Sequence, residues 1–289
     1  MTTATYHAPA SLSEALGLLA AHPGAQVLAG GTDLIVQVRA GRAAPSAFID
    51  IKTIAGLTGV RRSGEGFAIG AATPCTALLK DAALCAAWPG VVEAANLIGS
   101  VQVRNRATMG GNLCNASPAA DSVPALIAAG ATCLIAGPQG EREVAVTDLP
   151  QGPGRVALQP GELIVELRLP ARPMGGGDAY LRGIPRSEMD IAVAGAGVAL
   201  VLGADGLCTA ARVALGAVAP TALLVPEAGA ALVGTRIDDA ALTRMAAAAQ
   251  AACKPIDDKR GTAVYRIHMA GVLARRAALI ARDRAENNA

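Results

Sequence analysis

The order of apolar and polar residues predicts short helices and strands that alternate along the first part of the chain. Residues 11–14 fit a capping box, and the apolar residues after them are spaced as on one face of a helix that should end near 22–24. Residues 34–39 are too few for their periodicity to separate strand from helix. Short apolar runs that are typical of strands occur at 26–28, 47–51 and 67–69. Residues 1 to about 56 are therefore predicted to form one small lobe.

The middle of the chain continues with the same mixture of elements. The helices expected from apolar residues at helical spacing are 76–87, 91–97 and 124–129. The expected strands are 132–135, 143–146 and 163–169. In the last of these strands, the odd-numbered apolar residues should share one face. Residues 57–175 are predicted to form a second lobe.

Residues 170–178 are rich in proline and glycine and predict a domain linker or a long loop. The elements expected beyond it are strands 191–202 and 207–215, which form a hairpin, and helices 240–252 and 261–283. The long last helix should place Val264, Gly271 and Ala278 on one apolar face. Residues 176–289 are therefore predicted to be a separate domain.

Composition narrows the class of protein. Hydrophobic residues make up 52% and charged residues 17% of the chain, which predicts a large core and argues against disorder. A net charge of +2 without a basic cluster argues against nucleic-acid binding. No apolar run reaches the roughly 18 residues of a membrane span, and no signal peptide is recognisable, so a cytoplasmic location is expected. The six cysteines form no Cys-x-x-Cys pair, which predicts free thiols rather than a metal centre.

Two glycine pairs are the strongest candidates for a binding site. Residues 27–34 read Val-Leu-Ala-Gly-Gly-Thr-Asp-Leu, and residues 108–112 read Thr-Met-Gly-Gly-Asn. Adjacent glycines permit positive φ and the close approach of a ligand, and amide N–H groups in such turns bind anions. A tight turn between strands is the alternative for either pair alone. Together, two such loops could cradle the two halves of one pyrophosphate.

The other residues with useful chemistry are few. Asp121 could accept hydrogen bonds from ribose or adenine, or it could cap the helix that begins near Pro124. Arg104 and Arg106 could pair with phosphates, although a solvated face is the favoured interpretation. The chain has no Rossmann fingerprint, no phosphate-binding P-loop and no catalytic constellation. The polar candidates as a set suit a phosphate-bearing ligand better than acid–base catalysis; they are Thr32, Asp33, Thr108, Asn112, Asn115, Ser117, Asp121 and Ser122.

Several longer motifs carry a resemblance to a known family over nearly the whole chain. They are Leu-Ala-Gly-Gly-Thr-Asp-Leu at 28–34, Ser-Val-Gln-Val-Arg-Asn-Arg-Ala-Thr-Met-Gly-Gly-Asn-Leu-Cys-Asn-Ala-Ser-Pro-Ala-Ala-Asp at 100–121, Pro-Gly-Glu-Leu-Ile at 160–164, Gly-Ala-Val-Ala-Pro-Thr at 216–221 and Pro-Ile-Asp-Asp-Lys-Arg-Gly at 255–261. The chain resembles the FAD-binding medium subunits of the molybdenum hydroxylases, the family of xanthine dehydrogenase and carbon monoxide dehydrogenase.

The resemblance implies an α+β fold, with a two-lobed FAD-binding domain of the vanillyl-alcohol oxidase type over 1–175. A smaller α+β domain with an antiparallel sheet and helices would follow over 176–289. Both glycine stretches would hold the FAD pyrophosphate, Asp121 would contact the adenosine half, and Tyr180 and Arg182 would lie near the flavin ring. The residues assigned to FAD in this way are Leu28, Ala29, Gly30, Gly31, Thr32, Asp33, Leu34, Thr108, Met109, Gly110, Gly111, Asn112, Asp121, Ile164, Tyr180 and Arg182. No residue is assigned a catalytic or metal-binding role.

The resemblance also implies partners. Electrons would pass from molybdopterin on a large subunit through [2Fe–2S] clusters on a small subunit to this FAD, and then to NAD⁺ or another acceptor. The complex would be a dimer of heterotrimers. Two alternatives stay open: a self-contained flavin-dependent oxidoreductase of the same fold, and an assembly module without flavin. The residues do not specify the substrate of the complex.

Overall fold

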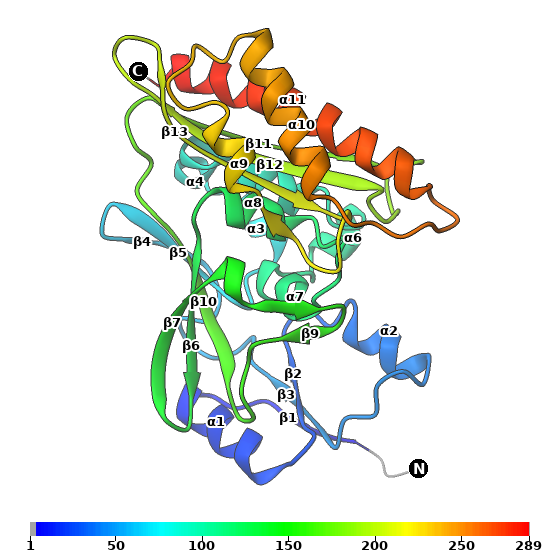
Figure 1. The fold of residues 1–289 in the computed structure, drawn as a ribbon. Coiled ribbons are helices and arrows are strands. Elements are labelled where there is room, and N and C mark those ends of the chain that lie inside the picture. Colours follow the sequence, from blue (N-terminus) through cyan, green and yellow to red (C-terminus); the bar gives the residue numbers. More distant parts are fainter. Residues whose placement is uncertain (1–3, 289) are drawn as a thin grey trace.

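The computed structural model describes residues 4–288, whose elements are drawn in Figure 1. The N-terminal part holds a three-stranded parallel sheet in the order β1-β3-β2, made of β1 (Thr5–His7), β3 (Ala47–Asp50) and β2 (Gln26–Leu28). Helix α1 (Leu12–Ala21) packs beside β3, and the Ser11 hydroxyl oxygen accepts the Glu14 N–H at 3.1 Å, so the predicted cap is confirmed. The undecided residues 34–39 form helix α2 (Leu34–Arg39).

A second sheet is antiparallel and five-stranded, in the order β4-β5-β10-β6-β7. Its strands are β4 (Val60–Ser63), β5 (Gly66–Gly70), β10 (Leu163–Leu169), β6 (Thr132–Gly137) and β7 (Gly140–Ala145). The accompanying helices are α3 (Cys75–Leu78), α4 (Ala82–Ala87), α5 (Pro89–Asn96), α6 (Val101–Arg104), α7 (Met109–Cys114), α8 (Ser122–Ala128) and the 3₁₀ turn η1 (Val146–Asp148). A small hairpin joins β8 (Pro150–Gly152) to β9 (Arg155–Val156).

The single helix predicted over 76–87 is wrong, because the chain forms α3 and α4 there. The Asp81 carboxylate accepts the Leu84 N–H at 2.8 Å and so caps a new helix. Helix α4 ends before Trp88, and Pro89 then occupies the first turn of α5. Proline is tolerated at that position because its missing N–H would have had no partner within the helix.

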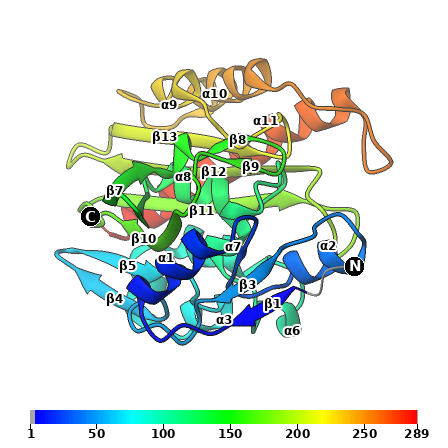
Figure 2. The same cartoon turned by 90° about the horizontal axis from the view of Figure 1, so that it is seen from below.

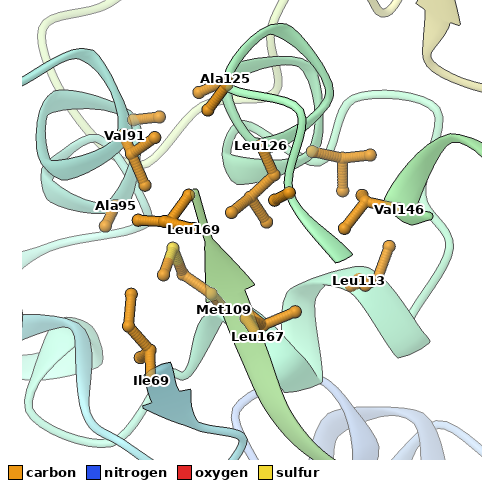
Figure 3. Packing of buried hydrophobic residues seen from close by; sticks show 14 of the residues in the cluster. Ile69, Val91, Ala95, Met109, Leu113, Ala125, Leu126, Val146, Leu167 and Leu169 are labelled. Carbon is orange, nitrogen blue, oxygen red and sulfur yellow. The ribbon is translucent and has the colours of Figure 1, made fainter. Parts of the chain in front are cut away.

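Strand β10 lies at the centre of the second sheet and departs from the predicted alternation. Its register against β6 shifts between Ile164 and Glu166, as at a β-bulge. Leu163 and Val165 consequently pack in the core beside the N-terminal sheet, whereas Leu167 packs in the larger core drawn in Figure 3. The expectation that the odd-numbered apolar residues share one face is therefore wrong.

The C-terminal part is an antiparallel sheet between helices. Its order is β11-β12-β13-β14, and its strands are β11 (Gly176–Gly183), β12 (Ala194–Leu202), β13 (Cys208–Gly216) and β14 (Leu223–Leu224). Its helices are α9 (Pro226–Ala230), α10 (Asp239–Ala252) and α11 (Ala263–Glu286). Helix α11 packs on β11 and β12 with α10 against it, while α8 contacts the sheet from below in the view of Figure 1. The predicted hairpin and both long helices are confirmed.

The apolar face predicted for the last helix is partly wrong. Val264 is 78% exposed, because the buried position in the first turn of α11 belongs to Arg266. The Arg266 guanidinium donates to the Val193 carbonyl oxygen at 2.7 Å and pairs with Asp258. No helix in the described part of the chain combines the length and the hydropathy that a membrane crossing needs.

Candidate functional site

A cleft of about 600 Å³ is lined by residues from the N-terminal sheet, from β10 and from α7. Its volume lies within the range of roughly 300–1,000 Å³ that is usual for small-molecule and cofactor sites. The predicted site residues that line it are Leu28, Ala29, Gly30, Gly31, Thr32, Asp33, Leu34, Thr108, Gly110, Gly111, Asn112 and Ile164. The fold thus brings both glycine pairs to one cleft.

The first glycine stretch presents an array of backbone donors. Strand β2 ends at Leu28 and α2 begins at Leu34, so the residues between them belong to neither element. Among residues 4–288, no protein acceptor takes a hydrogen bond from the N–H groups of Gly30 to Leu34. Gly31 turns the chain with a φ of +74°, a left-handed conformation that favours glycine. Consecutive unpaired amides in such a turn attract anions, so this stretch fits a phosphate group.

Gly30 has a different role from Gly31. A Cβ atom at Gly30 would lie 2.1 Å from the carbonyl oxygen of Arg106, in the segment that precedes the second glycine pair. The absence of a side chain therefore lets two segments from different parts of the chain pack backbone against backbone. Gly30 is required by this packing, whichever ligand the cleft binds.

The second glycine pair lies in a helix, so its prediction as a loop is wrong. The Thr108 hydroxyl oxygen accepts the Gly111 N–H at 2.9 Å and caps α7, which places both glycines in its first turn. A Cβ atom at Gly110 would lie 2.6 Å from the Ala71 carbonyl oxygen. The nearest atom to a Cβ at Gly111 is the capping oxygen of Thr108, at 3.0 Å. Gly111 therefore lines the cleft with its backbone, and no side chain covers the turn at this position.

The neighbours of this pair divide between cleft and core. The Asn112 side-chain oxygen accepts the Ser122 hydroxyl at 2.7 Å, which ties α7 to α8 and leaves the Asn112 amide nitrogen for the cleft. Met109 is only 1% exposed, and its sulfur points among the apolar residues labelled in Figure 3. Met109 can therefore reach a ligand through its backbone but not through its side chain.

Asp121, Tyr180 and Arg182 form a buried cluster outside the cleft lining. Asp121 accepts the Tyr180 hydroxyl at 2.9 Å and the Arg182 guanidinium at 2.5 Å. Burial raises the pKa of Asp121 to about 6, although both partners oppose this effect. The Asp121 side chain makes no capping hydrogen bond, so the helix-cap alternative does not hold. The three side chains therefore form one hydrogen-bonded group, and none of them lines the cleft.

Arg104 is neither solvated nor in the cleft. It is 7% exposed and donates to the carbonyl oxygens of Ile98 and Gly99 at 3.4 and 3.3 Å. The favoured interpretation of a solvated face is therefore wrong for Arg104, whereas Arg106 is exposed. The buried guanidinium fixes the turn that leads into α6.

A polar anchor missed by the sequence reasoning lies behind the first glycine stretch. The Lys52 ammonium donates to the Ala29 carbonyl oxygen at 3.1 Å and to both Asp50 carboxylate oxygens at 2.7 Å. The Tyr6 hydroxyl donates to the same carboxylate at 2.6 Å. Burial alone would raise the pKa of Asp50, but the hydrogen bonds from Lys52 and Tyr6 outweigh it and lower that pKa. This network fixes the end of β2.

Sequence reasoning also missed Gln37 and Gly154 as cleft residues, and it named Asn115 only as one of several polar candidates. Gln37 is the one polar residue within the apolar run 34–38, which is the signal that could have identified it. Gly154 reaches the cleft because its N–H donates to the Ala116 carbonyl oxygen at 3.0 Å, which seats the β8–β9 hairpin there. That contact has no local sequence signal.

The cleft is suited to holding a ligand rather than to proton transfer. Burial raises the pKa of Cys114, which lines it, to about 12, so this thiol is not a nucleophile at neutral pH. Among the described residues, no group of three or more His, Cys, Asp or Glu side chains is placed to hold a metal ion. Backbone amides, side-chain amide groups and apolar walls define the class: a binding site for a phosphate-bearing cofactor with a large apolar part.

Comparison with family models agrees with this class. Residues 2–172 match the model described as the FAD binding domain in molybdopterin dehydrogenase. Residues 179–281 match the CO dehydrogenase flavoprotein C-terminal domain. Together the two models cover most of the chain, so this chain belongs to the family of FAD-binding medium subunits of the molybdenum hydroxylases.

Individual relatives are similar over nearly the full length. The carbon monoxide dehydrogenase medium chain of Afipia carboxidovorans is 40% identical over 283 residues, which cover 98% of each chain. The xanthine dehydrogenase FAD-binding subunit of Escherichia coli O157:H7 is 36% identical over 75% of each chain. The solved structure of reconstituted CO dehydrogenase from Oligotropha carboxidovorans superimposes with a TM-score of 0.94 at 38% identity, covering 98% of both chains. The family resemblance and the two-part α+β fold are confirmed.

Proposed function

We propose that this chain is an electron-transfer subunit that holds one FAD in the cleft between its two N-terminal sheets. In this proposal the FAD-binding domain is 1–175 and the C-terminal domain is 176–289. The observation that carries the proposal is the run of unpaired amides from Gly30 to Leu34, which faces the bare side of Gly111 across one cleft. Such a site suits the two phosphates of a dinucleotide.

The chain's own groups bind and orient the cofactor. The amides of the first glycine stretch and the Thr32 hydroxyl would take one side of the pyrophosphate, and the Gly110–Asn112 turn would take the other. Ile164 would contribute an apolar wall for the flavin ring from strand β10. When bound, the flavin supplies the redox chemistry, and the protein supplies position and electrostatics.

We propose that the Asp121, Tyr180 and Arg182 cluster supports the wall of the FAD site from behind α7. It is linked to the cleft through Ser122, next to Asp121, because the Ser122 hydroxyl donates to the cleft residue Asn112. The Asp121 carboxylate and the Arg182 guanidinium, both buried, provide a fixed dipole there.

Partners follow from what the relatives are called. Relatives named medium chain or FAD-binding subunit are parts of larger enzymes, and this supports assembly with a large molybdopterin subunit and a small [2Fe–2S] subunit. In that complex the chain would receive electrons from iron–sulfur clusters and deliver them to NAD⁺ or another acceptor. The names of the relatives span different substrates, so this subunit does not determine what the complex oxidises.

The test places a charge in the pyrophosphate site. The purified chain should carry near one FAD, read from its visible absorbance. Gly111→Asp should lose it, because a carboxylate beside the pyrophosphate repels the phosphates, whereas the isosteric Gly111→Asn should retain most of it. Circular dichroism confirms that both variants are folded.

A colourless wild-type chain that takes up no added FAD would overturn the proposal, and so would equal FAD content in both variants. If the chain alone oxidised an organic substrate, the self-contained flavoenzyme would replace the electron-transfer subunit. Co-purification of molybdenum and iron–sulfur chains from a co-expressed complex is the result expected for the partner assignment.

A further inference from the structure

Helix α2 is connected across the cleft by one side-chain hydrogen bond. The Gln37 side-chain nitrogen, on α2, donates to the side-chain oxygen of Asn115 at 2.8 Å. Asn115 is the residue that ends α7, and both residues line the cleft. Figure 1 and Figure 2 both show α2 to the right of α7, and the two bonded residues are 78 positions apart in the sequence.

Little else holds α2 in place. None of its residues is buried, and Val36 is 55% exposed. Within the described residues, no side chain of α2 other than Gln37 forms a hydrogen bond or an ion pair. The helix makes no extensive contact with another helix or strand in the same part of the chain. It is therefore tied to the second lobe mainly through Gln37.

The position of α2 also controls the amide array. The helix begins at Leu34, directly after the unpaired amides, and the N–H of Ile35 donates to the Gly31 carbonyl oxygen at 3.1 Å. A movement of α2 would therefore carry Gly31 and its neighbours away from α7. The Lys52 anchor fixes the other end of the stretch at Ala29, so the stretch has one fixed end and one end that depends on α2.

We infer that the Gln37–Asn115 hydrogen bond is a latch that holds α2 across the cleft and slows release of the bound cofactor. The inference rests on the proposed FAD site. The two residues act as positioning residues through their mutual bond, so that the cofactor leaves when the bond opens and α2 swings out. A bond between side chains that merely share the surface would have no such effect on release.

Release of FAD from the purified holo-protein measures the latch directly, as the rise of free-flavin fluorescence after dilution. Gln37→Ala and Asn115→Ala should each release FAD on the order of threefold to tenfold faster, the range expected for loss of one neutral hydrogen bond. The double variant should release it no faster than either single variant. If each residue instead contacted FAD separately, the two effects would multiply, and the latch would be refuted.

Hydrogen–deuterium exchange of the FAD-free protein separates the latch from the cofactor assignment. The amides of residues 35–40 should exchange faster in both single variants than in the wild type, with the rest of the chain unchanged. Matched controls are Gln102→Ala and Asn96→Ala, both exposed and without a side-chain hydrogen bond in the described structure. Unchanged exchange in α2 would overturn the latch even if the protein binds FAD. Faster exchange in a protein that takes up no FAD would show instead that the cofactor assignment had failed.

Discussion

At the scale of single residues, the buried ion pair between Asp121 and Arg182 joins the two domains. The side chains are 9% and 4% exposed, and Asp121 belongs to the start of α8 while Arg182 belongs to β11. Each charge has left water, so each depends on the other for its stabilisation. The Tyr180 hydroxyl completes the coordination of the carboxylate.

Removing one member of this pair should destabilise the folded protein far more than removing both. We expect Asp121→Asn or Arg182→Met alone to lower the free energy of unfolding by about 3–5 kcal/mol, because the remaining group is buried without its partner. The free energy of unfolding of the double variant should fall by much less than the sum of the two single-variant losses. Chemical denaturation of all four proteins measures this, and additive losses would show that the pair is not coupled.

At the scale of elements, the end of β2 is positioned by a strand-to-strand anchor rather than by its own sequence. The Lys52 ammonium, which follows β3, donates a hydrogen bond to the Ala29 carbonyl oxygen. The same ammonium donates to the Asp50 carboxylate, which fixes its position. The lowered pKa of Asp50 makes this anchor dependent on pH. Because the folded protein binds the proton less tightly than the unfolded chain, the anchor stabilises the fold above the ordinary pKa of Asp, about 3.9. That stabilisation disappears as the pH falls through the lower pKa of the folded state.

Asp50→Asn should therefore lower the free energy of unfolding at pH 7, on the order of 1.5–3 kcal/mol for loss of a hydrogen-bonded charge. The difference in the free energy of unfolding between wild type and variant, which is the stability gap, should narrow as the pH is lowered below about 4. Urea denaturation at pH 7 and pH 3 measures the gap. Asp148→Asn, at an exposed aspartate without a side-chain hydrogen bond in the described structure, should show little gap at either pH. A gap at Asp50 that does not change with pH would contradict the anchor.

At the scale of the whole molecule, the two domains meet with their backbones in contact. A Cβ atom at Gly197 of β12 would lie 2.7 Å from the Pro124 carbonyl oxygen of α8. On the other face of the sheet, a Cβ at Gly177 would lie 1.8 Å from the Ala281 carbonyl oxygen of α11. Glycines in the neighbouring strands β11 and β12 thus let helices from both sides approach closely, with few aromatic side chains to fill the space.

Gly197→Ala should lower the free energy of unfolding by roughly 1–3 kcal/mol, because the added methyl group forces the domains apart. Gly17→Ala is the matched control, since a Cβ atom at Gly17 in α1 would have no neighbour within 4 Å. That change should instead raise stability by about 0.5–1 kcal/mol through helix propensity. Thermal unfolding of the wild type and both variants measures these changes. Equal melting temperatures for the wild type and Gly197→Ala would show that the domain contact does not need Gly197.

Several features of this protein follow from its sequence because they depend on neighbours within a few positions. The Ser11 cap, the hairpin of β12 and β13 and the long helices α10 and α11 were predicted in this way. The glycine motifs also identified the family, since their order and spacing are written in the chain. Local hydrogen bonds and side-chain periodicity involve residues within one or two turns of each other, so the order of residues in the sequence is enough to predict them.

Only the tertiary structure decided which distant residues meet. Gln37 and Asn115 are 78 positions apart, Asp121 and Arg182 are 61 apart, and Tyr6 and Asp50 are 44 apart. The bulge in β10 likewise appears only when the strand is paired with β6. The sequence determined which chemical groups are present, whereas packing of the two sheets determined which of them share a cleft.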